Sequence, residues 1–141
     1  MSYVTFEDMK NKFGERELVD LTSSGGISIE VNLEKLELAM SAANSEIDGY
    51  LIGRYELPLK TIPAFLVSLA CDMAHYHASV GETLETERTK TRYEIAVKNL
   101  TNISKGLISL GGAPAGESSP APTSSNNVIW SVGRSDFKRG F

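Results

Sequence analysis

The fold is decided by residues 63–79, which read PAFLVSLACDMAHYHAS. Pro63 suits the first position of a helix, because a missing N–H and a fixed φ are tolerated there. The helix that follows carries few charges, and its apolar residues include Phe65, Leu66, Leu69, Ala70, Met73, Ala74 and Tyr76. A helix that is apolar on most sides is covered by other helices. The stretch therefore predicts a central helix, ending at about Ser79, around which the rest of the chain folds.

A long helix is predicted on each side of this central one. Asn32 is a good N-cap for the first, whose apolar residues recur at steps of three and four, at Leu33, Leu36, Met40, Ala43, Ile47, Tyr50 and Leu51. Gly49 and Gly53 near its end indicate either a close approach of backbones or a weakened last turn. The second runs from about Leu84 to Lys105, with Gly106 following it and an inner face of Tyr93, Ala96, Val97, Leu100 and Ile103.

Two short helices are predicted before the long ones. Residues 5–8, Thr-Phe-Glu-Asp, resemble a capping box with Asp in place of Glu. They predict a helix over Phe6–Phe13 that Gly14 ends, followed by a second helix over Glu15–Leu21 and a loop over Thr22–Ser28. We therefore expect residues 1–110 to form an all-α body, a small bundle of about four to five helices.

The composition changes sharply after this body. Residues 111–127 are nearly all Gly, Ala, Pro, Ser, Thr and Asn, which is typical of a flexible linker. As a coil they would span about 23 Å, and fully extended roughly 50 Å. Residues 128–141 then turn apolar and basic and contain the chain's one Trp. Such an end is either disordered or a docking arm that covers its apolar residues on a partner.

The docking interpretation assigns roles within the arm. Residues 128–132 are rich in strand formers, so we expect them to add as an extended β-strand to the edge of a partner's sheet. Trp130 and Phe137 would be the anchors. The partner-binding residues of the arm are then Val128, Ile129, Trp130, Val132, Arg134, Phe137, Lys138, Arg139 and Phe141.

The net charge of −4 is unevenly placed along the chain. Residues 128–141 hold three basic residues against Asp136, a net +2, so the remainder carries −6. An acidic body argues against DNA as a bound target, although DNA could slide past such a surface. We find no apolar run near the ~18 residues of a membrane span and no signal-peptide pattern. The single cysteine excludes an intramolecular disulfide, and these features together favour the cytoplasm.

Residues with catalytic or metal-binding chemistry are few. Helical spacing brings Cys71, Asp72 and His75 near one another, as a metal site would require. The stronger interpretation is that Cys71 and His75 are core or interface residues of an apolar helix. No nucleophile elbow or P-loop spacing is present. We therefore expect a protein that is not an enzyme and that needs no cofactor.

Charged residues near the helix ends are candidates for contacts with other subunits. Arg54 would pair with Asp48 or Asp72, line a groove, or pack its stem on Tyr55. The stretch from Glu85 to Arg92 carries both positive and negative charges, which indicates a solvated helix face or, in a ring assembly, a subunit contact. The possible subunit contacts are Glu85, Arg88, Arg92 and Arg54.

Several stretches resemble the gp36 family of Mu-like phages and prophages. They are residues 3–5 (YVT), 13–18 (FGEREL), 46–59 (EIDGYLIGRYELPL), 69–74 (LACDMA), 106–111 (GLISLG) and 135–141 (SDFKRGF). The resemblance covers nearly the whole chain, and residues 46–59 are its most specific part. It implies a virion neck protein similar to the head–tail adaptors of long-tailed phages.

The resemblance also implies partners. Such adaptors form a ring, usually of twelve subunits, below the portal protein, and packaged DNA passes through the hole without sequence-specific binding. Their C-terminal tail adds to the portal, and their lower side accepts a stopper or tail-completion protein. The location would be the virion neck, with the host cytoplasm during assembly and no membrane. The alternative is a small helical regulatory or nucleic-acid-binding module, for which no strongly basic recognition helix is predicted.

Overall fold

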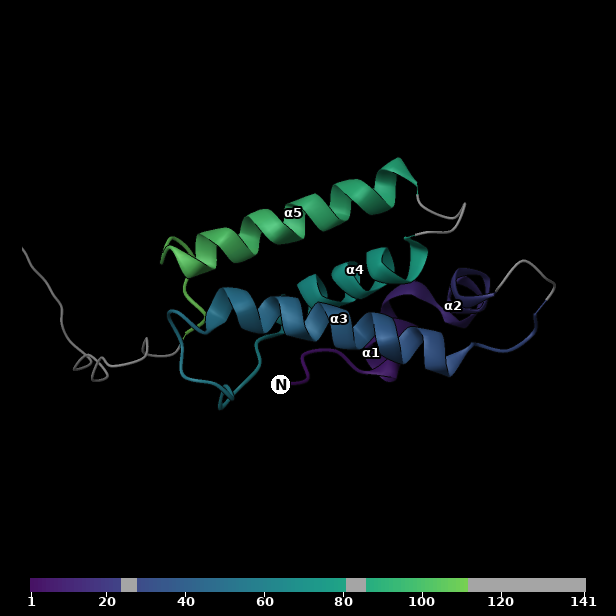
Figure 1. Ribbon diagram of the computed structural model, residues 1–141, viewed down its shortest axis with the longest axis horizontal. Helices are drawn as coiled ribbons and strands as arrows, with labels where there is room; N and C mark the ends of the chain where they lie inside the picture. The colour runs from purple at the N-terminus through teal and green to yellow at the C-terminus, as the bar shows by residue number, and fades with distance from the viewer. Residues whose placement is uncertain (24–27, 81–85, 112–141) are drawn as a thin grey trace, which may run out of the picture.

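The computed structural model describes residues 1–23, 28–80 and 86–111 (Figure 1). Within them lie five helices and no strand: α1 (Phe6–Phe13), α2 (Glu15–Thr22), α3 (Leu33–Leu51), α4 (Ala64–Ser79) and α5 (Glu87–Ser104). The all-α body is confirmed. The predicted linker beyond Gly111 and all nine predicted arm residues lie outside the described residues, as does Glu85. No helix in the described part is long and apolar enough to span a membrane.

Helix α4 is the centre of the bundle, as its sequence predicts. Figure 1 shows it between α3 and α5, and it also packs against α1 and α2. Its buried residues lie on nearly every side, at Leu66, Leu69, Ala70, Cys71, Met73, Ala74, His75, Ala78 and Ser79. Two details differ from expectation. Pro63 is the N-cap of α4 rather than its first residue, and Phe65 in the first turn is 43% exposed because it lies on the outer side of that turn, whereas Leu66 beside it is fully buried.

Helix α3 begins as predicted. The Asn32 side chain accepts a hydrogen bond from the Lys35 N–H at 3.2 Å and so caps its first turn. Its buried face consists of Leu36, Ala39, Ala43, Ile47 and Leu51. Leu33, predicted on this face, is 52% exposed because a residue at a helix end has fewer neighbours to cover it. A Cβ added at Gly49 or Gly53 would meet no atom within 4 Å, which rules out the first of the two alternatives for these glycines, a close approach of backbones.

Helix α5 starts later than predicted, because Thr86 caps it by accepting a hydrogen bond from the Thr89 N–H. Ala96, Leu100 and Ile103 are buried, as expected for its inner face. Gly106 follows the last residues with φ +80°, a left-handed conformation that favours glycine. The chain then turns back, and the Leu110 N–H donates to the Tyr55 hydroxyl at 3.2 Å. The described chain thus leaves the bundle where α3 and α5 end (Figure 1).

The two short helices follow the local sequence closely. Thr5 and Asp8 cap each other's backbone N–H groups, which confirms the capping box at the start of α1. Helix α2 includes Thr22, which the sequence assigned to the following loop. The Thr22 hydroxyl donates to the Leu18 carbonyl and accepts from the Asn32 N–H at 3.0 Å. This buried hydroxyl therefore ties the end of α2 to the start of α3.

Candidate partner-binding cleft

His75 on α4 joins three helices at one end of the bundle. Its side chain is buried, and its ring centroid lies 4.6 Å from that of Phe13 at the end of α1. Its Nε2 lies 3.2 Å from Oε1 of Glu17 on α2. Burial lowers the pKa of His75, since a charged imidazolium is poorly solvated there, and the hydrogen bond with Glu17 opposes that shift. His75 is thus an interface residue within the fold.

The neighbours of His75 on α4 face other partners. Asp72 pairs with Lys12 of α1 at 2.8 Å, and Lys12 also donates to the Ser68 hydroxyl at 2.9 Å. Cys71 points into the core, and burial raises the pKa of its thiol to about 11. The three side chains that helical spacing brought together therefore diverge. No cluster of three or more metal-ligating side chains occurs within the described residues.

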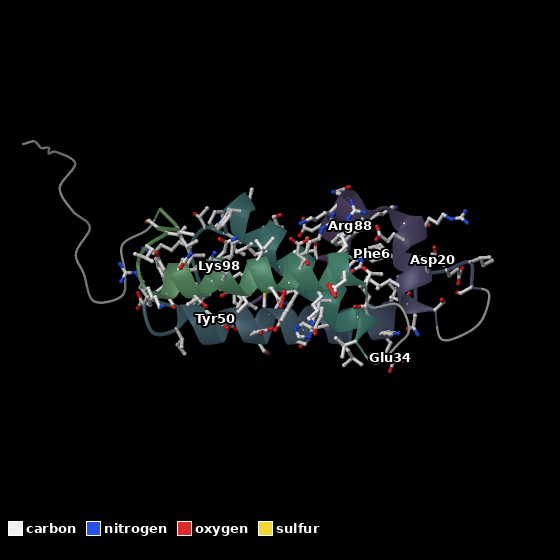
Figure 2. The ribbon with its side chains drawn as sticks, turned by 90° about the horizontal axis from the view of Figure 1, so that it is seen from above. Phe6, Asp20, Glu34, Tyr50, Arg88 and Lys98 are labelled. Atoms are coloured by element: carbon white, nitrogen blue, oxygen red, sulfur yellow. The ribbon has the colours of Figure 1, made fainter. Side chains whose placement is uncertain are left out.

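A cleft of about 540 Å³ opens beside His75, between α1, α2, α4 and the start of α5. Phe13 and Leu21 are its apolar lining residues, and helices α2 and α5 both contribute charged residues. The α5 side carries Arg88 and Arg92, whereas the α2 side carries the carboxylates of Glu17 and Asp20. The remaining lining residues are Lys12, His75, Thr86 and Thr89. In Figure 2, Arg88 and Asp20 lie toward the same end of the molecule, and Lys98 lies toward the other.

Two of the predicted subunit contacts, Arg88 and Arg92, meet in this cleft. Neither guanidinium takes part in an ion pair or hydrogen bond within the described residues, although the carboxylates of Glu17 and Asp20 line the same cleft. Positive charges without an internal partner are available to an external one. Sequence reasoning pointed to the two arginines but not to Phe13 or Glu17, because these contacts join residues far apart in the chain.

A second polar cluster lies between α3, α4 and α5. One Glu46 oxygen accepts from the Tyr93 hydroxyl at 2.7 Å, and the other lies 3.0 Å from His77 Nε2. Tyr76 stacks on Tyr93 with ring centroids 4.1 Å apart. Burial and the bond to Glu46 both raise the pKa of Tyr93 above its usual range. The cluster satisfies its own polar groups, so it fastens the helices together rather than presenting free groups to a ligand.

Arg54, the remaining predicted subunit contact, lies within the fold. Its guanidinium rests against Gly106, where an added Cβ would come 2.7 Å from Arg54 Cζ. Its expected acidic partners are engaged elsewhere. Asp48 accepts from the Tyr3 hydroxyl at 2.6 Å, and Asp72 pairs with Lys12. Arg54 therefore links the end of α3 to the end of α5.

Comparisons with known proteins give a consistent picture. A family model described as Bacteriophage Mu, Gp36 matches residues 3–129. The chain is 39% identical over 77 residues to the Mu-like prophage FluMu protein gp36 of Haemophilus influenzae, a match that covers 55% of this chain and 53% of that relative. It is 28% identical over 106 residues to gene product J of Escherichia phage Mu, covering 75% of this chain and 74% of the relative. The chain thus matches about half the length of the first relative and about three quarters of the second.

Proposed function

The chain belongs to the Bacteriophage Mu Gp36 family, and from this premise we propose that it is a structural protein of the virion neck, a head–tail connector. The single observation that carries the proposal is this membership, which agrees with the resemblance that the sequence showed. In this proposal the protein has a structural role and is not an enzyme. It forms a ring, of about twelve subunits by analogy with head–tail adaptors, below the portal protein.

The described body offers features that suit such a role. It is a small all-α bundle whose core is formed around α4, so a subunit can keep its fold while its surface contacts other subunits. The cleft at the start of α5 combines charged residues of both signs with apolar ones, a combination common at protein interfaces. Arg88 and Arg92 are the subunit contacts we propose there. Arg54 is the weakest of the proposed contacts, because it already packs against Gly106.

The arm supplies the attachment to the portal in this proposal. Residues 128–132 would add as a strand to a sheet edge of the portal, with Trp130 and Phe137 as anchors. The opposite side of the ring would accept a stopper or tail-completion protein. Packaged DNA would pass through the hole without sequence-specific binding, since the acidic body repels phosphates weakly.

Deletion of residues 128–141 tests the proposal. The truncated chain should keep the far-UV circular dichroism of the full-length protein, because every helix of the described body precedes residue 128. A phage or prophage that carries only the truncated gene should fill its heads but fail to join them to tails, as judged by electron microscopy. A matched control replaces the exposed Lys98 with Ala and should leave joining intact.

Three other results of this deletion would contradict the proposed role of the arm or of the protein. Joined virions at normal yield would overturn the role of the arm. Loss of the body's helical signal would show that the arm is part of its own core. Heads that fail to fill, or tails that fail to form, would place the protein in another step of morphogenesis.

A further inference from the structure

The cleft beside His75 carries charged residues from α1, α2 and α5, and only some of them pair within the described part of the fold. The α5 side presents Arg88 and Arg92, whose guanidinium groups have no ion-pair partner among the described residues, and the α2 side presents Glu17 and Asp20. Phe13 also lines the cleft, and its ring centroid lies 4.6 Å from that of His75. A segment that fits this cleft needs an apolar anchor flanked by an acidic residue on one side and basic residues on the other. The cleft volume of about 540 Å³ lies in the range of ordinary binding sites.

The chain contains a segment with this order of side chains. Residues 136–139 read Asp-Phe-Lys-Arg. We propose that this segment of the arm binds in the cleft of its own chain. Phe137 rests on Phe13, Asp136 pairs with Arg88 and Arg92, and the two basic residues face the α2 wall. Each contact joins groups of opposite charge or two aromatic rings, so the match does not depend on one interaction.

The chain is long enough to make this contact. Gly111 lies where α5 ends and the cleft lies where α5 begins, and the 18 residues of α5 span about 27 Å. The 24 residues between Gly111 and Asp136, whose composition is that of a coil, have a mean span of about 27 Å. A tether of this length holds the segment at an effective concentration near ~1 mM. A contact with an intrinsic Kd below about 1 mM is therefore occupied more than half of the time within one chain.

This contact has a consequence that rests on the proposed function. It covers Arg88 and Arg92, the same residues that we propose as subunit contacts. A free subunit would keep its ring-forming surface occupied by its own arm. Withdrawal of the arm by the portal would then expose that surface only where a ring is needed. The contact itself is a property of the isolated protein, and its test does not involve virion assembly.

The chain's single Trp makes the contact measurable. Exchanging Trp130→Phe together with Phe137→Trp moves the only indole of the full-length chain to the proposed anchor. A docked indole should show blue-shifted emission and slow quenching by acrylamide. Adding Arg88→Glu with Arg92→Glu should raise the quenching constant several-fold and shift the emission to the red. Adding Asp136→Arg to that variant should restore protection, because the charges are then opposite again.

A matched control and the contrary outcomes complete the test. Reversing the charge of Lys98 and Lys105, two exposed lysines toward the other end of α5, should leave the quenching constant unchanged. Where the Arg88 and Arg92 variant loses its helical signal, Asp136→Lys in the arm tests the same pairs without altering the body. Equal quenching in all variants would overturn the contact. Protection that grows between about 1 µM and about 100 µM protein would overturn the own-chain arrangement, since intramolecular docking does not depend on concentration.

Discussion

His75 makes the stability of this fold depend on pH. Its unfolded pKa is about 6.5, and burial lowers the pKa in the folded protein. Below about pH 6.5 the His75 side chain binds a proton in the unfolded chain, whereas in the folded chain it binds one only at lower pH. The stabilisation is therefore complete above about pH 6.5 and is lost as the pH falls through the folded pKa. His75→Gln should flatten the decline in unfolding free energy from about pH 7.5 to about pH 5, measured by urea titration.

Glu17 supplies a companion test for His75. Its hydrogen bond raises the pKa of His75 against the effect of burial. Glu17→Gln should therefore lower the pKa of His75 further, measured by NMR titration of the imidazole. The loss of stability would then extend to lower pH than in the unaltered protein. An imidazole pKa that rises in Glu17→Gln would contradict this assignment of causes.

Gly106 is the residue at which a side chain should be tolerated least at the end of α5. Its φ of +80° is left-handed, and an added Cβ would also displace the Arg54 guanidinium. Gly106→Ala should cost about 1–2 kcal/mol of unfolding free energy, because most L-residues are strained there. Gly106→Asn adds the same Cβ but tolerates the conformation better, so it should cost less. Equal losses would instead indicate that displacement of Arg54 dominates.

At the scale of the element, α4 shows that position on the helix matters more than residue size. Leu66 is fully buried, whereas its larger neighbour Phe65 is 43% exposed. Leu66→Ala should cost about 2–5 kcal/mol, since it leaves a cavity in the core. Phe65→Ala should cost less, because much of its ring already contacts water. Urea denaturation of both variants measures the difference, and a larger loss for Phe65→Ala would contradict the packing described.

Local chemistry explains why most element boundaries could be predicted. The capping box at Thr5 and the N-cap at Asn32 act within one turn, so residues next to one another in sequence suffice to place α1 and α3. The start of α5 was missed by three residues, because Thr86 competes with several equally polar neighbours for the cap. The exposure of Leu33 was also missed, since it depends on which elements cover the first turn.

The candidate site could be predicted only in part. The sequence identifies Arg88 and Arg92 as possible contact residues because they are charged and lie near the start of a helix. The sequence does not identify their neighbours in the cleft, because Glu17 and His75 are 58 residues apart and meet only after α2 packs on α4. The network of Glu46, His77 and Tyr93 was missed for the same reason. Periodicity identifies which face of a helix is buried, but it does not pair that face with another.

At the scale of the whole molecule, two different ends can be distinguished. The cleft lies at the end where α5 begins, and the described chain departs at the end where α5 finishes (Figure 1). A partner bound in the cleft therefore lies a full helix length away from the start of the linker. In the proposed assembly, this separation would let one subunit meet one neighbour through the cleft and another through the chain beyond Gly111.

The net charge of −4 leads to an expectation about DNA. In the proposed ring DNA would slide past the protein, which should then not hold phosphates, and non-specific binding at physiological salt needs several lysine or arginine contacts. We expect fluorescence anisotropy to detect no saturable binding of a labelled duplex at about 0.15 M salt and up to about 10 µM protein. Reversing two exposed carboxylates on α3, by Glu34→Lys with Glu37→Lys, should strengthen association at low salt if repulsion is responsible. Tight binding by the unaltered protein, weakening steeply as salt is added, would contradict the expectation and favour a nucleic-acid-binding module instead.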